Sequence, residues 1–406
     1  MGKSVGGSTG PLFAVYVAWH PKFRGGGHIA EALRQYFRRD IYDDVTGGLG
    51  ISVLFRSTPL ENTALPGDIN LREAKGTAII LLAEEHMASD PDWIAYVRNL
   101  ADRADKTGLH ARLFPVSIGA AGMKLGIQEQ ALRWDSWAGN DRARTTRLIR
   151  ELVNCFCRIM RHCLARLQRP GQTSDGLPAY LQKVKVFLSH SKHDNRGESI
   201  ASRLREHLQA EAALASFFDV QDIPAGLRFD AVLLTEVRLS AMVAIHTDSY
   251  SSREWCRREV IEAKRCQVPF IVANCLGHID ERSFPYLGNV PIIQLHAASP
   301  ARIDVLVCRL LEEVLRDLLW RCRIESSAGR APHVLFLARP PELLSLLASA
   351  DRSGRHTILE RAIERREAIV VYPDPPLSAE EERLLHAVAP RVQLRSFTEW
   401  RAGVIR

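Results

Sequence analysis

The sequence predicts an α/β protein built from doubly wound parallel sheets. Three observations predict this class: short runs rich in Val, Ile and Leu recur along the chain, amphipathic stretches separate them, and clusters of Pro, Gly and Ser mark the borders. Strands that alternate with helices form βαβ units, and strands buried on both faces are apolar throughout. A length of 406 residues allows about two to four domains.

The first part of the chain is a domain at residues 12–168, which follows a flexible N-terminus at 1–11. Apolar, β-prone runs predict its strands, and helical spacing of apolar residues predicts its helices. We expect strands at 13–19, 50–55, 77–83 and 111–118, and helices at 28–37, from near Trp93, and across 148–167.

A linker rich in Pro, Gly and Ser at residues 169–182 precedes a second domain at 183–325. The same patterns predict its strands at 184–188, 215–219, 241–246, 268–273 and 291–295, with helices at 198–209, 229–238, 252–265 and 301–322. A small C-terminal α/β module at 326–406 follows, with strands at 334–337, 368–372 and 392–394 and a helix at 342–348. Ser378 and Glu381 predict a capping box at the start of a further helix.

Composition and charge exclude several classes of protein. The net charge of +7 is spread over scattered arginines, so we expect no dedicated nucleic-acid-binding patch. No run reaches the roughly 18 apolar residues that a membrane helix needs. The 8 cysteines are too sparse for a disulfide scaffold, which favours the cytoplasm. Cys155 and Cys157 face different ways on one helix, so we expect buried thiols there and no metal site.

Three segments of the second domain carry residues suited to chemistry. FLSHSKHD (187–194) and FFDVQDIPAG (217–226) both lie where a predicted strand ends, and open α/β sheets bind ligands at that edge. SSREWCRRE (251–259) follows the third strand. In it, Ser251 and Glu254 predict a capping box, and Trp255 and Glu259 share one helix face.

In this order and spacing, the three segments resemble a Toll/interleukin-1 receptor (TIR) domain over about residues 183–322. FLSHSKHD resembles the first box of the family, and FFDVQDIPAG resembles the second box with its BB loop. SREWCRRE resembles the segment that holds the catalytic glutamate in NAD-cleaving members. His190 departs from the Tyr found in many members. The resemblance implies a flavodoxin-like sheet.

The resemblance also implies site residues and partners. Glu259 corresponds to the glutamate that breaks the nicotinamide–ribose bond, and Trp255 to the aromatic residue beside the nicotinamide. The implied substrate-binding residues are completed by the first-strand loop and the BB loop: Ser189, His190, Ser191, Asp219, Asp222 and Gly226. NAD would be the substrate, with no cofactor or metal. Other TIR domains would be partners in a homo-oligomer or filament, in bacterial signalling or anti-phage defence.

The chemistry of NAD cleavage suits one carboxylate. Nicotinamide carries a positive charge in NAD and leaves as a neutral molecule, so no general acid has to protonate it. A single carboxylate such as Glu259 can stabilise the oxocarbenium-like ribose that remains, whereas most glycosidases need two carboxyl groups. The products would be nicotinamide with ADP-ribose or a cyclic derivative.

The first domain resembles a TIR domain more weakly. Trp93 follows its third apolar strand as Trp255 does in the second domain, but Val97 stands where the second domain has Glu259. We therefore expect a degenerate, flavodoxin-like domain that serves as a pairing or regulatory platform. Glu84 and Glu85, near the end of that strand, leave a different catalytic arrangement open.

Two alternatives to an NAD-cleaving enzyme remain at this stage. The chain could be a non-catalytic scaffold whose TIR-like domains bind other TIR proteins through BB-loop contacts. It could also be a nucleoside deoxyribosyltransferase-like enzyme, which would likewise use one glutamate at a strand edge.

Overall fold

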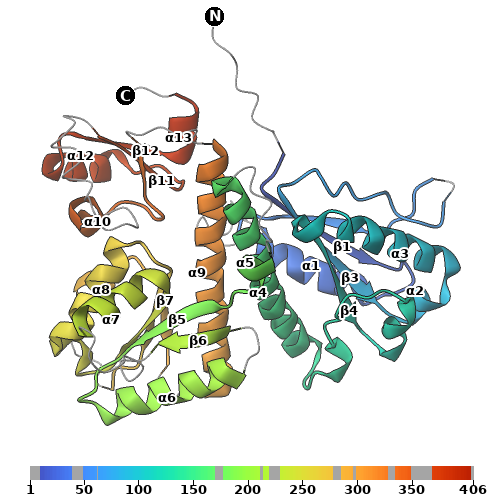
Figure 1. Cartoon of the computed structure of the whole chain (residues 1–406), viewed down its shortest axis with the longest axis horizontal. Coiled ribbons are helices and arrows are strands. Elements are labelled where there is room, and N and C mark those ends of the chain that lie inside the picture. The colour runs from blue at the N-terminus through green and yellow to red at the C-terminus, as the bar shows by residue number, and fades with distance from the viewer. Residues whose placement is uncertain are drawn as a thin grey trace, which may run out of the picture. The chain divides into compact units, whose positions relative to one another are not determined.

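A computed structural model describes residues 10–38, 49–61, 63–169, 177–210, 214–218, 229–277, 285–295, 299–327, 334–348 and 368–403 (Figure 1). The chain forms two compact units, residues 1–182 with 321–327 and residues 183–320 with 328–406. Within the described residues, the first unit holds one sheet and the second holds two.

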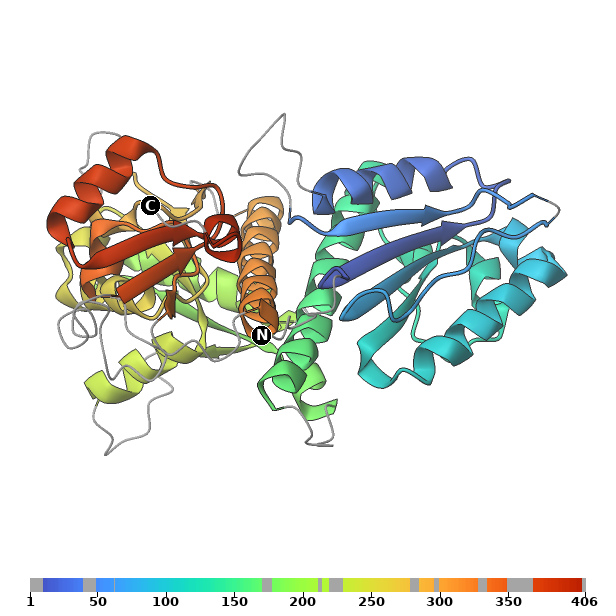
Figure 2. The same ribbon diagram turned by 90° about the horizontal axis from the view of Figure 1, so that it is seen from above.

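The sheet of the first unit has four parallel strands in the order β2-β1-β3-β4. They are β1 (Phe13–Trp19), β2 (Ser52–Arg56), β3 (Gly76–Ala83) and β4 (Ala111–Ser117). The helices of this unit are α1 (Gly26–Phe37), α2 (Glu85–Ser89), α3 (Pro91–Asp105), α4 (Asp141–Gln168) and α5 (Leu177–Leu181). Figure 2 shows α1 and α4 on one side of this sheet and α3 on the other.

Buried side chains fill both faces of the first sheet. On one face, Tyr16 and Ile79 belong to the same core cluster as Trp93 and Val97 of α3. On the other face, the ring of Phe156 from α4 lies 5.0 Å from Phe13 and 5.1 Å from Phe37. The two central strands, β1 and β3, are buried along nearly their whole length, so their sequences are apolar at almost every position rather than at every second one.

The larger sheet of the second unit has five parallel strands in the order β6-β5-β7-β8-β9. They are β5 (Val184–Ser189), β6 (Leu214–Phe218), β7 (Ala241–His246), β8 (Phe270–Asn274) and β9 (Ile292–Gln294). The helices are α6 (Asn195–Ala210), α7 (Phe229–Leu239), α8 (Glu254–Arg265) and α9 (Pro300–Ser327). The strand order reverses between β5 and β7, and ligands of such sheets bind beyond the carboxyl ends of the two strands at that point.

Helices cover both faces of this sheet as well. Val237 of α7 and Val260 of α8 belong to one core cluster with Phe187 and Met242 of the strands. Helices α6 and α9 are joined to each other by His207 and Asp304, whose side chains lie 2.9 Å apart. Figure 1 shows α7 and α8 on the opposite side of the sheet from α9.

The C-terminal module has a small parallel sheet in the order β10-β11-β12. Its elements are β10 (Val334–Phe336), α10 (Leu343–Ala348), β11 (Ala368–Tyr372), α12 (Ala379–Val388), β12 (Val392–Ser396) and α13 (Phe397–Arg401). The predicted capping box of Ser378 and Glu381 is present at the start of α12. A core cluster that includes Val370, Leu385 and Leu394 joins this sheet to α12.

The predicted fold class is confirmed, with tandem doubly wound parallel sheets and a small C-terminal α/β module. The predicted capping box of Ser251 and Glu254 is wrong. Ser251 is not the N-cap residue, because it lies in a 3₁₀ turn at Tyr250–Ser252. Helix α8 begins at Glu254, and its N-cap residue is Arg253, whose side chain makes no capping hydrogen bond. The Ser251 hydroxyl instead lies 3.0 Å from Nε2 of His246.

A search of the described residues for membrane-crossing helices found none that has the necessary length and apolar character. Cys157 and Cys163 are buried free thiols, as predicted, and Cys155 is half-buried. Burial raises the pKa of both Cys155 and Cys157 to about 12, so both stay protonated at neutral pH.

Candidate functional site

The candidate site lies beyond the carboxyl ends of β5 and β7. Ser189 is the last residue of β5 and is paired in register with Ala244 of β7. The turn that follows β7 leads directly into α8, which carries Trp255 and Glu259. The fold therefore brings the predicted first and third segments together at the point where the strand order reverses.

A chain of hydrogen bonds joins three buried side chains at this point. The Ser189 hydroxyl donates to Oε2 of Glu259. Since a serine hydroxyl has one proton, its oxygen accepts from Tyr250, whose Oη lies 2.6 Å away. Ser189 is 1% exposed, Tyr250 0% and Glu259 5%. The carboxyl group of Glu259 is thus held at the sheet edge by a hydroxyl relay.

The groups beside Glu259 keep their protons at neutral pH. Burial, with a smaller contribution from the neighbouring Glu259 carboxyl group, raises the pKa of Tyr250 well above its ordinary 10.0. Burial and then Glu259 raise the pKa of the Cys256 thiol to about 12. Tyr250 and Cys256 therefore remain neutral hydrogen-bond donors around the carboxyl group, and the Cys256 thiol lies 3.6 Å from the backbone carbonyl of His190.

Trp255 lies one turn before Glu259 and is much more accessible. It is 37% exposed, and the guanidinium of Arg258 lies 4.2 Å from the centre of its ring. This cation–π contact holds the indole on the surface of α8, one helical turn from Glu259. An exposed indole can stack on a planar ring such as nicotinamide.

His190 and Ser191 continue the strand end into a second group of hydrogen bonds. His190 is half-buried, with Nδ1 3.4 Å from the carbonyl of Leu188. Ser191 is 1% exposed and accepts from the hydroxyl of Ser249, at 2.9 Å. The same Ser249 hydroxyl lies 3.3 Å from Oδ2 of Asp194. These bonds tie the loop after β5 to the turn after β7.

Asp194 anchors the loop after β5. Burial works to raise its pKa, but hydrogen bonds from neighbouring groups, among them the backbone N–H groups of Arg196 and Gly197, hold it below the ordinary 3.8. Its Oδ1 accepts from the Arg196 N–H at 2.9 Å. A charged Asp194 therefore fixes the start of α6 and, through Ser249, the turn after β7.

Three of the predicted substrate-binding residues lie outside the described residues. They are Asp219, Asp222 and Gly226 of the predicted BB loop. Of the predicted residues that are described, Ser189 and Glu259 are in direct contact, and Trp255, His190 and Ser191 come from the same two connecting segments. Sequence reasoning missed Tyr250 and Ser249. Their position in the loop after the third strand, beside the switch point, was the signal that could have found them.

The corresponding edge of the first unit has different chemistry. Trp93 and Val97 of α3 are both 0% exposed and belong to the core. The carboxylate of Glu84 caps α2 by accepting from the backbone N–H groups of His86 and Met87. Asp90 caps α3 in the same way. These carboxylates are bound to helix termini, which gives them a structural role.

The structure shows no group of three or more His, Cys, Asp or Glu side chains arranged for a metal ion within the part of the chain that it describes.

The fold and the site define a doubly wound α/β domain with the carboxyl group of Glu259 and several hydroxyls at its switch point. Residues 186–307 match the family model for the TIR domain, so the chain contains a TIR domain. This confirms the family resemblance of the second domain. The match leaves out residues 12–168, so the resemblance of the first domain to this family stays a prediction.

Other comparisons add little. The search of curated proteins found no match. Among solved structures, the chain is similar to the tagatose-6-phosphate ketose/aldose isomerase from Escherichia coli, with 14% sequence identity and coverage of 82% of this chain and 88% of that chain. The TM-score is 0.19, so this similarity supports no conclusion about fold or function.

Proposed function

We propose that the TIR domain cleaves NAD between nicotinamide and ribose, with Glu259 as the catalytic carboxylate. The observation that carries this proposal is the relay from Tyr250 through Ser189 to Glu259, at the edge where such sheets bind ligands. Preorganised polar groups around a carboxylate at such an edge are suited to stabilising a charge that develops on a substrate. The family match supports the same reading, since some TIR domains cleave NAD.

Each residue has a defined role in this reaction. The Glu259 carboxylate stabilises the positive charge that develops on the ribose as nicotinamide departs. Ser189 and Tyr250 hold the carboxyl group in one orientation, which reduces the reorganisation needed at the transition state. The indole of Trp255 stacks on the nicotinamide ring. Water or a hydroxyl of the substrate then captures the ribose cation, giving ADP-ribose or a cyclic product.

The test is nicotinamide release from NAD by the full chain, followed by chromatography over a range of protein concentrations. Replacing Glu259 by Gln keeps the size and polarity of the side chain but removes its charge, so we expect a loss of about 10²–10³-fold or more. Glu254→Gln is the matched control, because Glu254 lies on the same helix and is exposed. Activity that survives in Glu259→Gln at the parental rate contradicts the proposal.

A non-catalytic scaffold is the second candidate, and the burial of Glu259 favours it. A carboxyl group that is 5% exposed and engaged by Ser189 can serve purely to join α8 to β5. In that case, no concentration of the chain releases nicotinamide, while the domain still binds other TIR domains. A pull-down with Pro224 or Gly226 replaced, run beside the NAD assay, separates the two functions.

We further propose that assembly with other TIR domains switches the activity on, in bacterial signalling or anti-phage defence. The first domain would then be a degenerate relative that serves as a pairing platform. The shared order of four strands supports this relationship, since β2-β1-β3-β4 in the first domain repeats β6-β5-β7-β8 in the second. Light scattering of the chain with and without residues 1–168, compared with nicotinamide release, tests it.

A further inference from the structure

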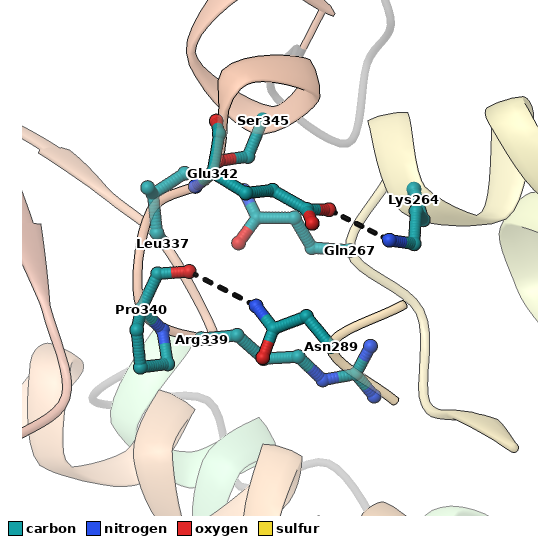
Figure 3. A pocket seen from close by; sticks show the side chains of 8 residues that line it. All are labelled: Lys264, Gln267, Asn289, Leu337, Arg339, Pro340, Glu342 and Ser345. Carbon is teal, nitrogen blue, oxygen red and sulfur yellow. Dashed lines mark hydrogen bonds and ion pairs between the residues drawn. The ribbon is translucent and has the colours of Figure 1, made fainter. Parts of the chain in front are cut away.

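The helix that carries Glu259 is held at its far end by the C-terminal module. Lys264, near the end of α8, is 7% exposed. Its Nζ donates to the Gly288 carbonyl at 2.7 Å and to Oε1 of Glu342 at 2.8 Å, as Figure 3 shows for Glu342. Lysine is almost never this deeply buried without a partner. Glu342 of the module therefore compensates a buried charge on the helix of the candidate site.

Two further contacts lie beside this ion pair. Oε1 of Gln267, just after α8, accepts from the backbone N–H of Ala338 in the module. The amide of Asn289 lies 3.5 Å from the Pro340 carbonyl (Figure 3). Gln267 and Asn289 have φ of 54° and 55°, a region that non-glycine residues rarely adopt. A cavity of about 30 Å³, lined by residues of the TIR domain and of the module, lies beside these contacts and is large enough for a water molecule.

The module also contacts α9. Arg339 pairs with Glu313 at 3.3 Å, and the ring of Phe397 meets Trp320 edge-on with centroids 5.4 Å apart. Glu313 is also close to two arginines of its own helix, so its charge is balanced without the module. The contact with Lys264 differs, because Glu342 is the carboxylate paired with that buried ammonium group.

We propose that the C-terminal module restrains α8, with the Lys264–Glu342 pair as its latch, and so limits the access of a substrate ribose to the buried Glu259. For a ribose to reach a carboxyl group that is 5% exposed, α8 or the loops around it must move. A helix fixed at its far end by a buried ion pair resists such movement, and release of the module permits it. For its catalytic consequence, this inference rests on the proposed function.

The test replaces Glu342 by Gln in the full chain and measures hydrogen exchange of the α8 amides beside nicotinamide release. Loss of a charge partner from a buried lysine should speed exchange across residues 254–265 by about tenfold. Nicotinamide release should rise several-fold. The control is Glu380→Gln, which breaks an exposed pair with Arg383 on α12 and should leave both readouts unchanged.

A double-mutant cycle with Lys264→Met guards against general damage to the fold. If the pair is the latch, Lys264→Met with Glu342→Gln should raise α8 exchange no further than the single variants do. Unchanged α8 exchange in Glu342→Gln overturns the restraint. Faster exchange with unchanged or lower NAD cleavage overturns its regulatory role. If the parent and all variants fail to release nicotinamide, the proposed function fails, and the exchange rates still decide whether the module restrains α8.

Discussion

The two larger sheets of this protein share a strand order but differ in the chemistry of their carboxyl edges. In each domain, the chain after the third strand of the sheet leads to a helix with a tryptophan near its start. This residue is Trp93 in α3 and Trp255 in α8. Trp93 is fully buried, whereas Trp255 is 37% exposed. Four residues later, Val97 is core and Glu259 is part of a hydroxyl relay. The shared topology therefore allows a site at the switch point, and the individual side chains at that edge determine whether a site forms there.

The largest expected difference concerns the two tryptophans. Trp93→Ala should destabilise the first unit by about 3–5 kcal/mol, because it removes a buried aromatic side chain and leaves a cavity. Trp255→Ala should cost at most about 1 kcal/mol, the worth of its cation–π contact. Hydrogen exchange of α3 and α8 amides measures each opening free energy. Equal losses at the two sites would mean that Trp255 is a core residue and no stacking platform.

The next prediction concerns the hydroxyl relay around Glu259, in whose place the first unit has the core residue Val97. Ser189→Ala removes the partner of the buried Tyr250 hydroxyl and should destabilise the TIR domain by about 1–3 kcal/mol. The control is Ser252→Ala, which changes an exposed serine in the same 3₁₀ turn as Tyr250. It should change the free energy of unfolding by no more than about 0.5 kcal/mol. Denaturant unfolding of the full chain compares the two variants. A neutral Ser189→Ala contradicts a relay that fixes Glu259.

A smaller effect on stability should distinguish Glu84, at the carboxyl edge of the first sheet, from Glu259, at the carboxyl edge of the TIR domain sheet. Glu84→Ala removes the cap of α2 and should cost about 1 kcal/mol in the first unit. Nicotinamide release should stay at the parental rate, since the Glu84 carboxylate is bound to the start of α2. Thermal unfolding and the NAD assay measure the two results. Loss of cleavage in Glu84→Ala would place chemistry in the first domain and break the comparison.

The smallest effect is the contribution of His246 to the pH dependence of stability in the TIR domain. Burial lowers the pKa of His246 below its ordinary 6.5, so the folded state resists a proton that the unfolded state accepts. This contribution to stability is complete above pH 6.5 and is lost as pH falls toward the folded-state pKa. His246→Gln should therefore lose less stability than the parent between about pH 7.5 and 5 in denaturant unfolding. A parallel loss in both proteins contradicts the role of His246.

Periodicity was enough to predict the fold class, and strand ends were enough to predict which segments meet at the candidate site. The strands at Phe13–Trp19 and Ala241–His246 have the predicted limits, because doubly covered strands are continuous apolar runs. Ser189 and Glu259 are distant in sequence but meet because adjacent parallel strands deliver their loops to one edge.

The rest depended on contacts that sequence spacing does not contain. Ser251 and Glu254 fit the spacing of a capping box. In the structure, however, Ser251 lies in the 3₁₀ turn before α8, and its hydroxyl is hydrogen-bonded to the ring of His246. The relay through Tyr250 requires a buried side chain to reach across from the turn after β7. The contact between Lys264 and Glu342 joins α8 to a module for which the sequence suggested no chemistry.

The most direct measurement of the central claim is hydrogen exchange of the Glu259→Gln variant with and without NAD, since this variant should hold NAD without cleaving it. The account predicts protection of residues 187–194 and 250–259, at the edge of the TIR domain, with no change at residues 18–25 and 84–93 of the first unit. Protection confined to the first unit, or absent from both edges at saturating NAD, would contradict a dinucleotide site at Glu259.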